Sequence, residues 1–142
     1  MDEILKKLSD HNIVLEPLSL KELSQLEGQL EVNFPKAYKE FLLAMGKGAG
    51  IYMKGSDVFY DTIPDLKDAS QELILDNNFL TLPPNSFVFW MHQGYQLAFF
   101  KLNEGENPPV YYYSEGLGLN DFMREKSFVD FLKMQLKMSS ID

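Results

Sequence analysis

The sequence has no cysteine among its 142 residues. This absence excludes disulfide bonds and thiolate chemistry, and it favours a reducing compartment, so we expect a cytoplasmic protein. Histidine is scarce too, and the chain has only two, His11 and His92. A protein zinc or iron site needs several converging His, Cys or carboxylate ligands, and neither an HExxH motif nor paired cysteines occur. We therefore expect no metal and no cofactor.

Long apolar runs are also missing. No run approaches the roughly 18 residues that a membrane span requires. The start, MDEILKKLSD, mixes acidic residues into a stretch that a leader peptide keeps basic and then apolar. We expect neither an export signal nor membrane contact. The 45% of hydrophobic residues is enough to form a core, and the length fits one domain, residues 1–142.

Basic residues are the third scarcity. The 13 Lys and Arg face 21 Asp and Glu, which gives a formal net charge of −8. Residues 55–123 contain ten of the acids and two of the bases, so this middle segment carries the whole excess. Such a field repels nucleic-acid phosphates and attracts a protein partner with a basic surface. The alternative is an acidic coat that only keeps the protein in solution.

Catalytic motifs are absent as well. The chain has no GxSxG nucleophile motif. The stretch GKGAG, residues 46–50, follows a predicted helix, whereas a phosphate-binding loop follows a strand and opens a helix, so we interpret it as a helix end. The tyrosines at 111–113 lack the basic neighbours that nucleic-acid binding requires. We predict a protein that is not an enzyme and binds no nucleic acid.

Helical spacing of apolar residues, with start and stop signals, predicts five helices. Ser19 and Glu22 form a capping-box pattern ahead of Leu20, Leu23, Leu26 and Leu30. Pro35 suits the first turn of the next helix, and Gly46 suits a left-handed cap at its end. Further helices are predicted near residues 4–8, from Pro64 with Leu66, Ala69 and Leu73 facing inward, and from Ser127 with Phe128, Phe131, Leu132 and Gln135 along one side.

Alternating and continuous apolar runs predict strands between these helices. Residues 50–63 are predicted to form a hairpin, and strands are predicted at 87–91, 95–102 and 110–113. A two-residue turn at Gln93 and Gly94 pairs four residues with partners across the hairpin. The predicted pairs are His92 with Tyr95, Trp90 with Leu97, Phe89 with Ala98 and Val88 with Phe99. We expect an α+β fold, an antiparallel β-meander flanked by helices.

His92 is the one candidate for a chemical group in an otherwise apolar hairpin. A lone histidine with no evident orienting carboxylate is a weak catalytic signal, so we favour a structural role beside the turn. The alternative is an enzyme that uses His92 as an acid or base, which requires a carboxylate within hydrogen-bonding reach in an open cleft. Gly94 is predicted to supply the positive φ that the turn demands.

The run LSLKELSQLEGQLEVNFPKAYKEFLLAMGKGAG resembles the signature of the SUKH superfamily, which also includes the yeast cell-wall assembly regulator. The matching features are LE, FP, YKEFLL and a glycine-rich exit. The stretches FWMHQGYQLAFF and ENPPVYYYSEG are similar to a bacterial subset in which a His-Gln-Gly-Tyr turn and a Pro-Pro-Val-Tyr strand recur together. A structural role accounts for all the motif positions, which are Glu27, Pro35, Tyr38, Trp90, His92, Gly94 and Tyr95.

The resemblance implies a non-catalytic α+β domain that serves as an immunity protein, binding and blocking a bacterial toxin that is often a nuclease. The alternative within the same fold is a regulatory or ligand-binding scaffold. The acidic middle segment suits a toxin with a basic surface. The acids we expect to contact such a partner are Asp57, Asp61, Glu104, Glu106 and Glu115.

Overall fold

The computed structural model describes residues 1–77, 81–115 and 122–141. Along the described chain the elements are α1 (Asp2–Asp10), α2 (Leu20–Leu30), α3 (Lys36–Met45), β1 (Ser56–Asp57), the 3-10 helix η1 (Ile63–Asp65), α4 (Leu66–Asn77), β2 (Ser86–His92), β3 (Gln96–Lys101), β4 (Val110–Ser114), β5 (Met123–Glu125) and α5 (Phe128–Met138). The strands form one antiparallel sheet in the order β1-β2-β3-β4-β5, so every strand pairs with its neighbour in sequence. The predicted α+β meander is confirmed.

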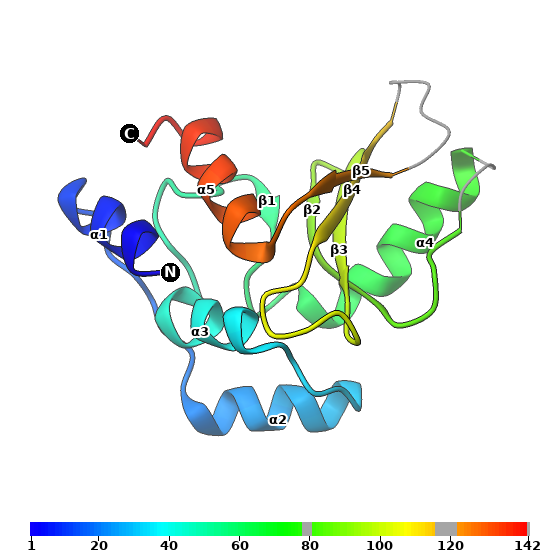
Figure 1. The fold of residues 1–142 in the computed structure, drawn as a ribbon, viewed down its shortest axis with the longest axis horizontal. Helices are drawn as coiled ribbons and strands as arrows, with labels where there is room; N and C mark the ends of the chain where they lie inside the picture. Colours follow the sequence, from blue (N-terminus) through cyan, green and yellow to red (C-terminus); the bar gives the residue numbers. More distant parts are fainter. Residues whose placement is uncertain (78–80, 116–121, 142) are drawn as a thin grey trace.

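Helices cover both faces of the sheet (Figure 1). On one face, α3 and α5 enclose the larger hydrophobic cluster with side chains of β2, β3 and β4. On the other face, α4 packs against a smaller cluster that includes Val88, Leu97 and Phe99. Helix α1 contacts α5 and α2 contacts α3, so these two helices form the outer part of the molecule. A sheet that is buried on both faces explains why its strands are continuously apolar in sequence.

Local signals in the sequence set the helix ends. Ser19 accepts from the backbone N–H of Glu22, and the Glu22 side chain accepts from the N–H of Ser19, so the predicted capping box is present. Ser127 caps α5 in the same way by accepting from the N–H of Asp130. Pro35 occupies the N-cap of α3 with φ −59°. The side chains of Ser19 and Ser127 satisfy donors that an α-helix leaves unpaired in its first turn, whereas Pro35 makes no side-chain cap.

Three details of the helix predictions are wrong. Gly46 has φ −58° and is not a left-handed cap, although a Cβ there would lie 3.0 Å from Cβ of Leu18, so close packing still favours glycine. Leu20 is 73% exposed, because the buried stripe of α2 runs through Leu23 and Leu26. Ala69 is exposed and Ser70 is buried in its place, with its hydroxyl donating to a backbone carbonyl of the same helix.

The predicted hairpin at 50–63 is also wrong. Its residues form turns, and β1 alone pairs with β2. Two contacts hold this segment against α5: the Tyr52 hydroxyl donates to the carbonyl of Leu132 at 2.7 Å, and the N–H of Met53 donates to Oγ of Ser139 at 3.0 Å. Because residues 52 and 53 are bound to α5, the backbone does not fold back on itself as a hairpin. The short strand β5 was not predicted, and it pairs with β4 at the edge of the sheet.

The register of β2 against β3 changes part-way along the strands. Val88 pairs with Phe99 as predicted, but Trp90 pairs with Ala98 and the pairing stays shifted by one residue up to the turn. Three predicted pairs are therefore wrong: Phe89 with Ala98, Trp90 with Leu97 and His92 with Tyr95. The shift between Val88 and Trp90 is a β-bulge, which inserts one extra residue into β2.

The bulge decides which side chains face α5. Val88 and Met91 belong to the cluster under α4, whereas the successive residues Phe89 and Trp90 both belong to the cluster under α3 and α5. In a regular strand Trp90 would share a face with Val88, because side chains alternate. His92, two residues beyond Trp90, also lies on the α5 side, where its ring stacks on the Trp90 indole at a centroid distance of 5.9 Å.

Candidate functional site

The five acids predicted to contact a partner are not brought together. Asp57 and Glu115 lie at the end of the sheet that carries the β2–β3 turn, and Asp61 precedes η1. Glu104 and Glu106 lie in the β3–β4 loop at the other end of those strands. Glu104 is half-buried and the other four are exposed. The five acids therefore do not form one surface for a partner.

Glu104 takes part in a local network. Its carboxylate accepts from the Tyr111 hydroxyl at 3.0 Å, and Lys101 Nζ lies 3.9 Å from it. The Tyr111 ring also lies under Lys101 Nζ, 4.9 Å from the ring centroid, and beside the Arg124 guanidinium at 5.7 Å. Burial, and after it the Glu104 carboxylate, raises the pKa of Tyr111. Charges of both signs meet here, so this end of the sheet is less acidic than the sequence suggests.

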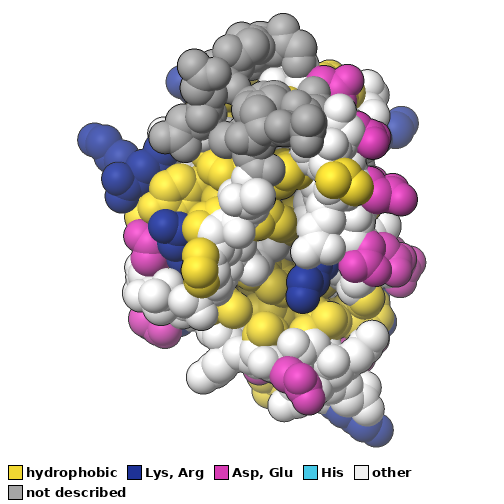
Figure 2. Space-filling view, turned by 90° about the vertical axis from the view of Figure 1, so that its right-hand side faces the viewer, with side chains coloured by type: hydrophobic (Ala, Val, Ile, Leu, Met, Phe, Trp, Pro, Cys, Tyr) yellow, Lys and Arg dark blue, Asp and Glu magenta, His cyan; other side chains and the backbone are white. Residues whose placement is uncertain are grey.

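The acidic residues of η1 and α4 form a single stripe instead, which we call the acidic face. It consists of Asp65, Asp68, Glu72 and Asp76, all exposed and spaced three or four residues apart. Figure 2 shows acidic side chains in a column along the right-hand side of the view, beside hydrophobic ones. Within the described chain none of the four forms an ion pair. The spacing of these acids is present in the sequence, but the fold is needed to show that all four lie on one exposed face.

The acidic face works against the stability of its own helix. Asp65 and Asp68 lie near the positive N-terminal end of the helix dipole, where a carboxylate is favourable. Asp76 lies near the C-terminal end, where an acid is unfavourable, and the last turn contains no base. Asp68 with Glu72, and Glu72 with Asp76, are like charges four residues apart, which also destabilise a helix. Helix formation therefore does not account for this pattern.

The motif positions in the N-terminal half have structural tasks. Glu27 Oε2 accepts from the backbone N–H of Phe34 at 2.8 Å, which ties the end of α2 to the start of α3, and Lys39 lies 3.7 Å away. Tyr38 is fully buried, and its hydroxyl has no hydrogen-bond partner among the residues that the structure describes. Burial raises the pKa of Tyr38 well above the usual tyrosine value. Its ring contacts those of Phe34, Phe41, Phe87, Phe89, Phe100 and Phe128.

The motif positions in the hairpin surround the turn. Gly94 has φ +77°, as predicted, and the N–H of Tyr95 donates to the carbonyl of His92 at 3.2 Å. His92 Nδ1 lies 2.9 Å from Oγ of Ser56, which links β1 to β2, and the Tyr95 ring meets the imidazole edge-on at 6.1 Å. In the described chain no carboxylate forms a hydrogen bond or ion pair with His92. The Ser56–His92 pair thus lacks the third group that orients a catalytic base.

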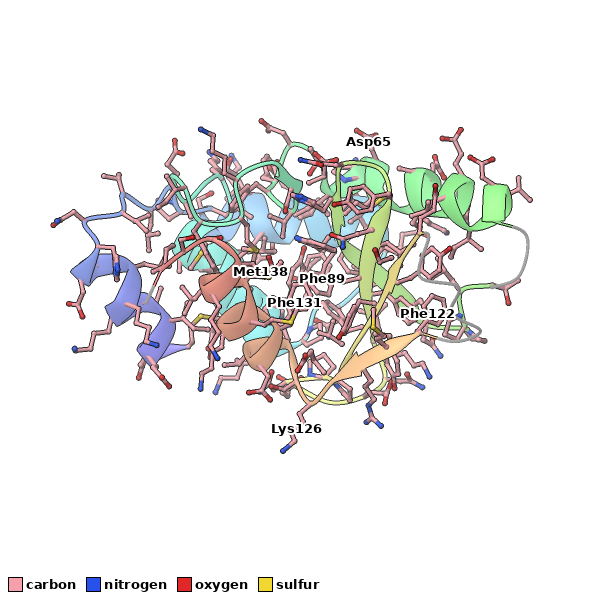
Figure 3. The ribbon with its side chains drawn as sticks, turned by 90° about the horizontal axis from the view of Figure 1, so that it is seen from above. Asp65, Phe89, Phe122, Lys126, Phe131 and Met138 are labelled. Atoms are coloured by element: carbon pink, nitrogen blue, oxygen red, sulfur yellow. The ribbon has the colours of Figure 1, made fainter. Side chains whose placement is uncertain are left out.

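A groove of about 450 Å³ opens beside His92 between the sheet and α5; we call it the α5 groove. Trp90, His92 and Tyr95 line its sheet side, and Gln135 and Met138 line its helix side. In Figure 3, Phe89 and Phe131 lie between the sheet and α5, with Met138 further along the helix. No sequence signal pointed to this groove, because its walls come from segments that are far apart in the chain.

Other kinds of site find no support within the described residues. No group of three or more His, Asp or Glu side chains there could hold a metal ion. None of the helices in that part of the chain has the length and the apolar character needed to cross a bilayer.

A comparison with protein families finds one match. The model described as SMI1-KNR4 cell-wall, SUKH_6, matches residues 20–132, which is well over half of the chain. The chain belongs to the SUKH family. No curated protein matches it.

The SUKH match extends from the first residue of α2 into α5. It includes the acidic face, the β2–β3 hairpin and most of the α5 groove, whereas α1 lies outside it. All seven motif positions lie within the matched residues. Membership of the SUKH family is compatible with an immunity role.

Proposed function

We propose that this SUKH protein is an immunity protein that binds and neutralises a bacterial toxin domain with a basic surface, as a nuclease has. The observation that carries the proposal is the acidic face, an exposed row of carboxylates without ion-pair partners among the described residues. A pattern that lowers the stability of its own helix is expected where function requires it. A toxin that must bind nucleic acid has the complementary charge.

An apolar pocket adjoins the acidic face and suits an anchoring side chain of the partner. Its volume is about 340 Å³, and it is lined by Ile63 and Pro64 of η1 and by Lys67 and Gln71 of α4, together with apolar residues of β2 and its approach. Protein interfaces gain affinity from a desolvated anchor and gain association rate from complementary charge around it. Acids beside an apolar pocket meet both requirements.

The acids predicted from sequence receive different support. Asp57 and Asp61 precede η1 in the chain, and we include them in the proposed contact. Glu106 and Glu115 are exposed and stay proposed contacts at the two ends of the sheet. Glu104 is the weakest of the five, because Tyr111 and Lys101 already engage its carboxylate.

In this proposal the protein neutralises the toxin by binding to it and not by catalysis. His92 is engaged by Ser56, Trp90 and Tyr95, and these contacts support a structural role for it. The alternative function, a non-catalytic regulatory or ligand-binding scaffold, is favoured by the α5 groove. An adjacent gene for a large protein with a variable C-terminal toxin domain supports the immunity function, whereas an isolated gene favours the scaffold.

Co-expression tests the proposal directly. Candidate toxin domains from the same genome are expressed in a bacterial host with and without this protein. We expect growth to be rescued for one toxin, and we expect that toxin, in a catalytically inactive form, to co-purify in a stoichiometric complex. Growth arrest by every candidate despite soluble expression of this protein would contradict the immunity function.

A further inference from the structure

Gln135 interrupts the apolar side of α5. It is 7% exposed, and the other buried residues of the helix are all apolar: Phe128, Phe131, Leu132 and Leu136. The backbone carbonyl of Gln135 accepts from the N–H of Ser139, but its side-chain amide forms no hydrogen bond with any described residue. A largely buried amide without a partner costs stability, so the packing of α5 does not account for a glutamine at this position.

The amide of Gln135 can be reached from the α5 groove, which this residue lines. Among the described side chains, the polar atoms that are sealed from solvent without a hydrogen bond belong to Tyr38 and Trp90. The Gln135 amide also has no hydrogen bond, but it is not sealed in this way, so its NH2 group and its carbonyl both open to the groove. They offer a ligand a donor and an acceptor side by side.

The sheet side of the groove carries a row of polar side chains across four strands. The row follows the strand register, in which Ser56 pairs with His92, His92 with Gln96 and Gln96 with Ser114. All four residues line the groove. Gln96 Nε2 donates to Oγ of Ser114 at 3.3 Å, which leaves Gln96 Oε1 without a donor among the described residues. This wall therefore adds an uncharged acceptor opposite Gln135.

The groove favours an uncharged ligand with an aromatic body. No Asp or Glu belongs to its described lining, and the one Lys or Arg there, Lys54, is exposed, so water screens its charge. Tyr95 and Tyr112 contribute rings to the lining, and Met134 and Met138 contribute thioethers. Methionine adapts to the shape of a ligand and makes favourable contacts between its sulfur and aromatic rings.

We propose that the α5 groove binds an uncharged aromatic amide in which an N–H and a C=O lie side by side. A primary carboxamide or a lactam presents this edge and can form two hydrogen bonds with the amide of Gln135. A carboxylate has acceptors alone and would leave the carbonyl of Gln135 unpaired. A trans peptide bond directs its N–H and C=O to opposite sides, so a peptide unit does not present this edge. A volume of about 450 Å³ is adequate for such a ligand.

This site goes beyond the proposed immunity function and does not depend on it. The groove lies on the α5 side of the sheet, whereas the acidic face belongs to α4 on the other side. A failure to bind aromatic amides would leave toxin binding untouched, and a failure to bind a toxin would leave the groove as it is.

Nuclear magnetic resonance titration of the isotope-labelled protein tests the proposal, because the side-chain amide of Gln135 and the indole of Trp90 give signals from two walls of the groove. The probes are benzamide and 2-quinolone, a carboxamide and a lactam. Their controls are N,N-dimethylbenzamide and N-methyl-2-quinolone, which lack the N–H, and benzoate, which is charged. We expect at least one amide to shift the Gln135 signals and to bind about tenfold more tightly than its methylated form and than benzoate.

Gln135→Met separates binding from folding, because methionine fills a similar volume without the amide. This variant should bind the amide probe about tenfold more weakly, and it should be at least as stable as the natural protein, since it removes a buried polar group without a partner. Gln25→Met, on an exposed residue of α2, is the matched control and should leave the affinity unchanged.

Three results would overturn the proposal. The first is that neither amide binds. The second is that the methylated forms or benzoate bind as tightly as the amides. The third is that Gln135→Met and Gln25→Met have equal affinity for the amide probe.

Discussion

At the scale of single residues, Tyr38 and Tyr52 form a matched pair. Both are fully buried, but the Tyr52 hydroxyl donates to the carbonyl of Leu132 whereas the Tyr38 hydroxyl has no partner in the described part of the chain. Both side chains fill core volume that a phenylalanine also fills. The two hydroxyls should therefore contribute to stability with opposite signs.

Tyr38→Phe should raise the free energy of unfolding by about 1 kcal/mol, because it removes a buried polar group that makes no hydrogen bond. Tyr52→Phe should lower the free energy of unfolding by about 1 kcal/mol, because it removes the buried hydrogen bond to the carbonyl of Leu132. Urea unfolding of both variants provides the comparison. A loss of stability in both would show that the Tyr38 hydroxyl has a partner in solution, such as a buried water.

The same two tyrosines predict sensitivity to alkali. Burial raises the pKa of both above the ordinary value of 10.0, so the folded state keeps protons that the unfolded state releases. Their titration therefore leaves the free energy of unfolding unchanged well below pH 10.0 and lowers it as the pH rises above that value. The decline is about 1.4 kcal/mol per pH unit for each tyrosine. Stability curves for the Tyr38→Phe variant should fall less steeply between about pH 10 and 11. Identical slopes in the two proteins would contradict the assignment.

At the scale of secondary-structure elements, Glu27 connects two helices. Glu27→Ala should lower the free energy of unfolding by about 1–3 kcal/mol, because the N–H of Phe34 then loses its charged acceptor. Glu27→Gln keeps an acceptor oxygen and should lose less. Thermal melts of both variants test this, and equal losses would show that the charge of Glu27, through Lys39, matters more than the hydrogen bond.

Two exposed glycines should respond oppositely to the same substitution. Gly28→Ala lies inside α2, where a Cβ meets nothing within 4 Å, and should raise the free energy of unfolding by about 0.5–1 kcal/mol. Gly94→Ala should lower it by about 1 kcal/mol or more, since φ +77° disfavours any Cβ although the space is open. Chemical unfolding measures both. A neutral Gly94→Ala would mean that the turn adopts another conformation in solution.

Sequence predicts the elements of this fold better than their register. The capping residues Ser19 and Ser127, the positive φ of Gly94 and the order of the meander all follow from local chemistry, and all are present. The bulge at Phe89 was not predictable, because both faces of β2 are apolar and a one-residue shift leaves the pattern unchanged. The α5 groove was hidden for a related reason: the bulge turns Trp90 and His92 toward α5.

At the scale of the whole molecule, the position of charge should matter more than its amount. Glu72→Gln with Asp76→Asn, and Glu104→Gln with Glu106→Gln, each change the formal net charge from −8 to −6. The first pair alone lies on the acidic face. We expect the first pair to stabilise α4 slightly, by removing like-charge repulsion and an unfavourable charge near the end of the helix dipole. Thermal melts of the two double variants check this expectation.

The rate constant for association with the cognate toxin, in a catalytically inactive form, tests the central claim most directly. It is measured by surface plasmon resonance at low and physiological salt for the natural protein and the two double variants. We predict that the Glu72 and Asp76 double variant associates more slowly at low salt by about tenfold. The Glu104 and Glu106 double variant should change the rate much less, and added salt should reduce the difference between the two variants. An association rate that is indifferent to salt and to both double variants would contradict the account, and the acidic excess would then serve solubility alone.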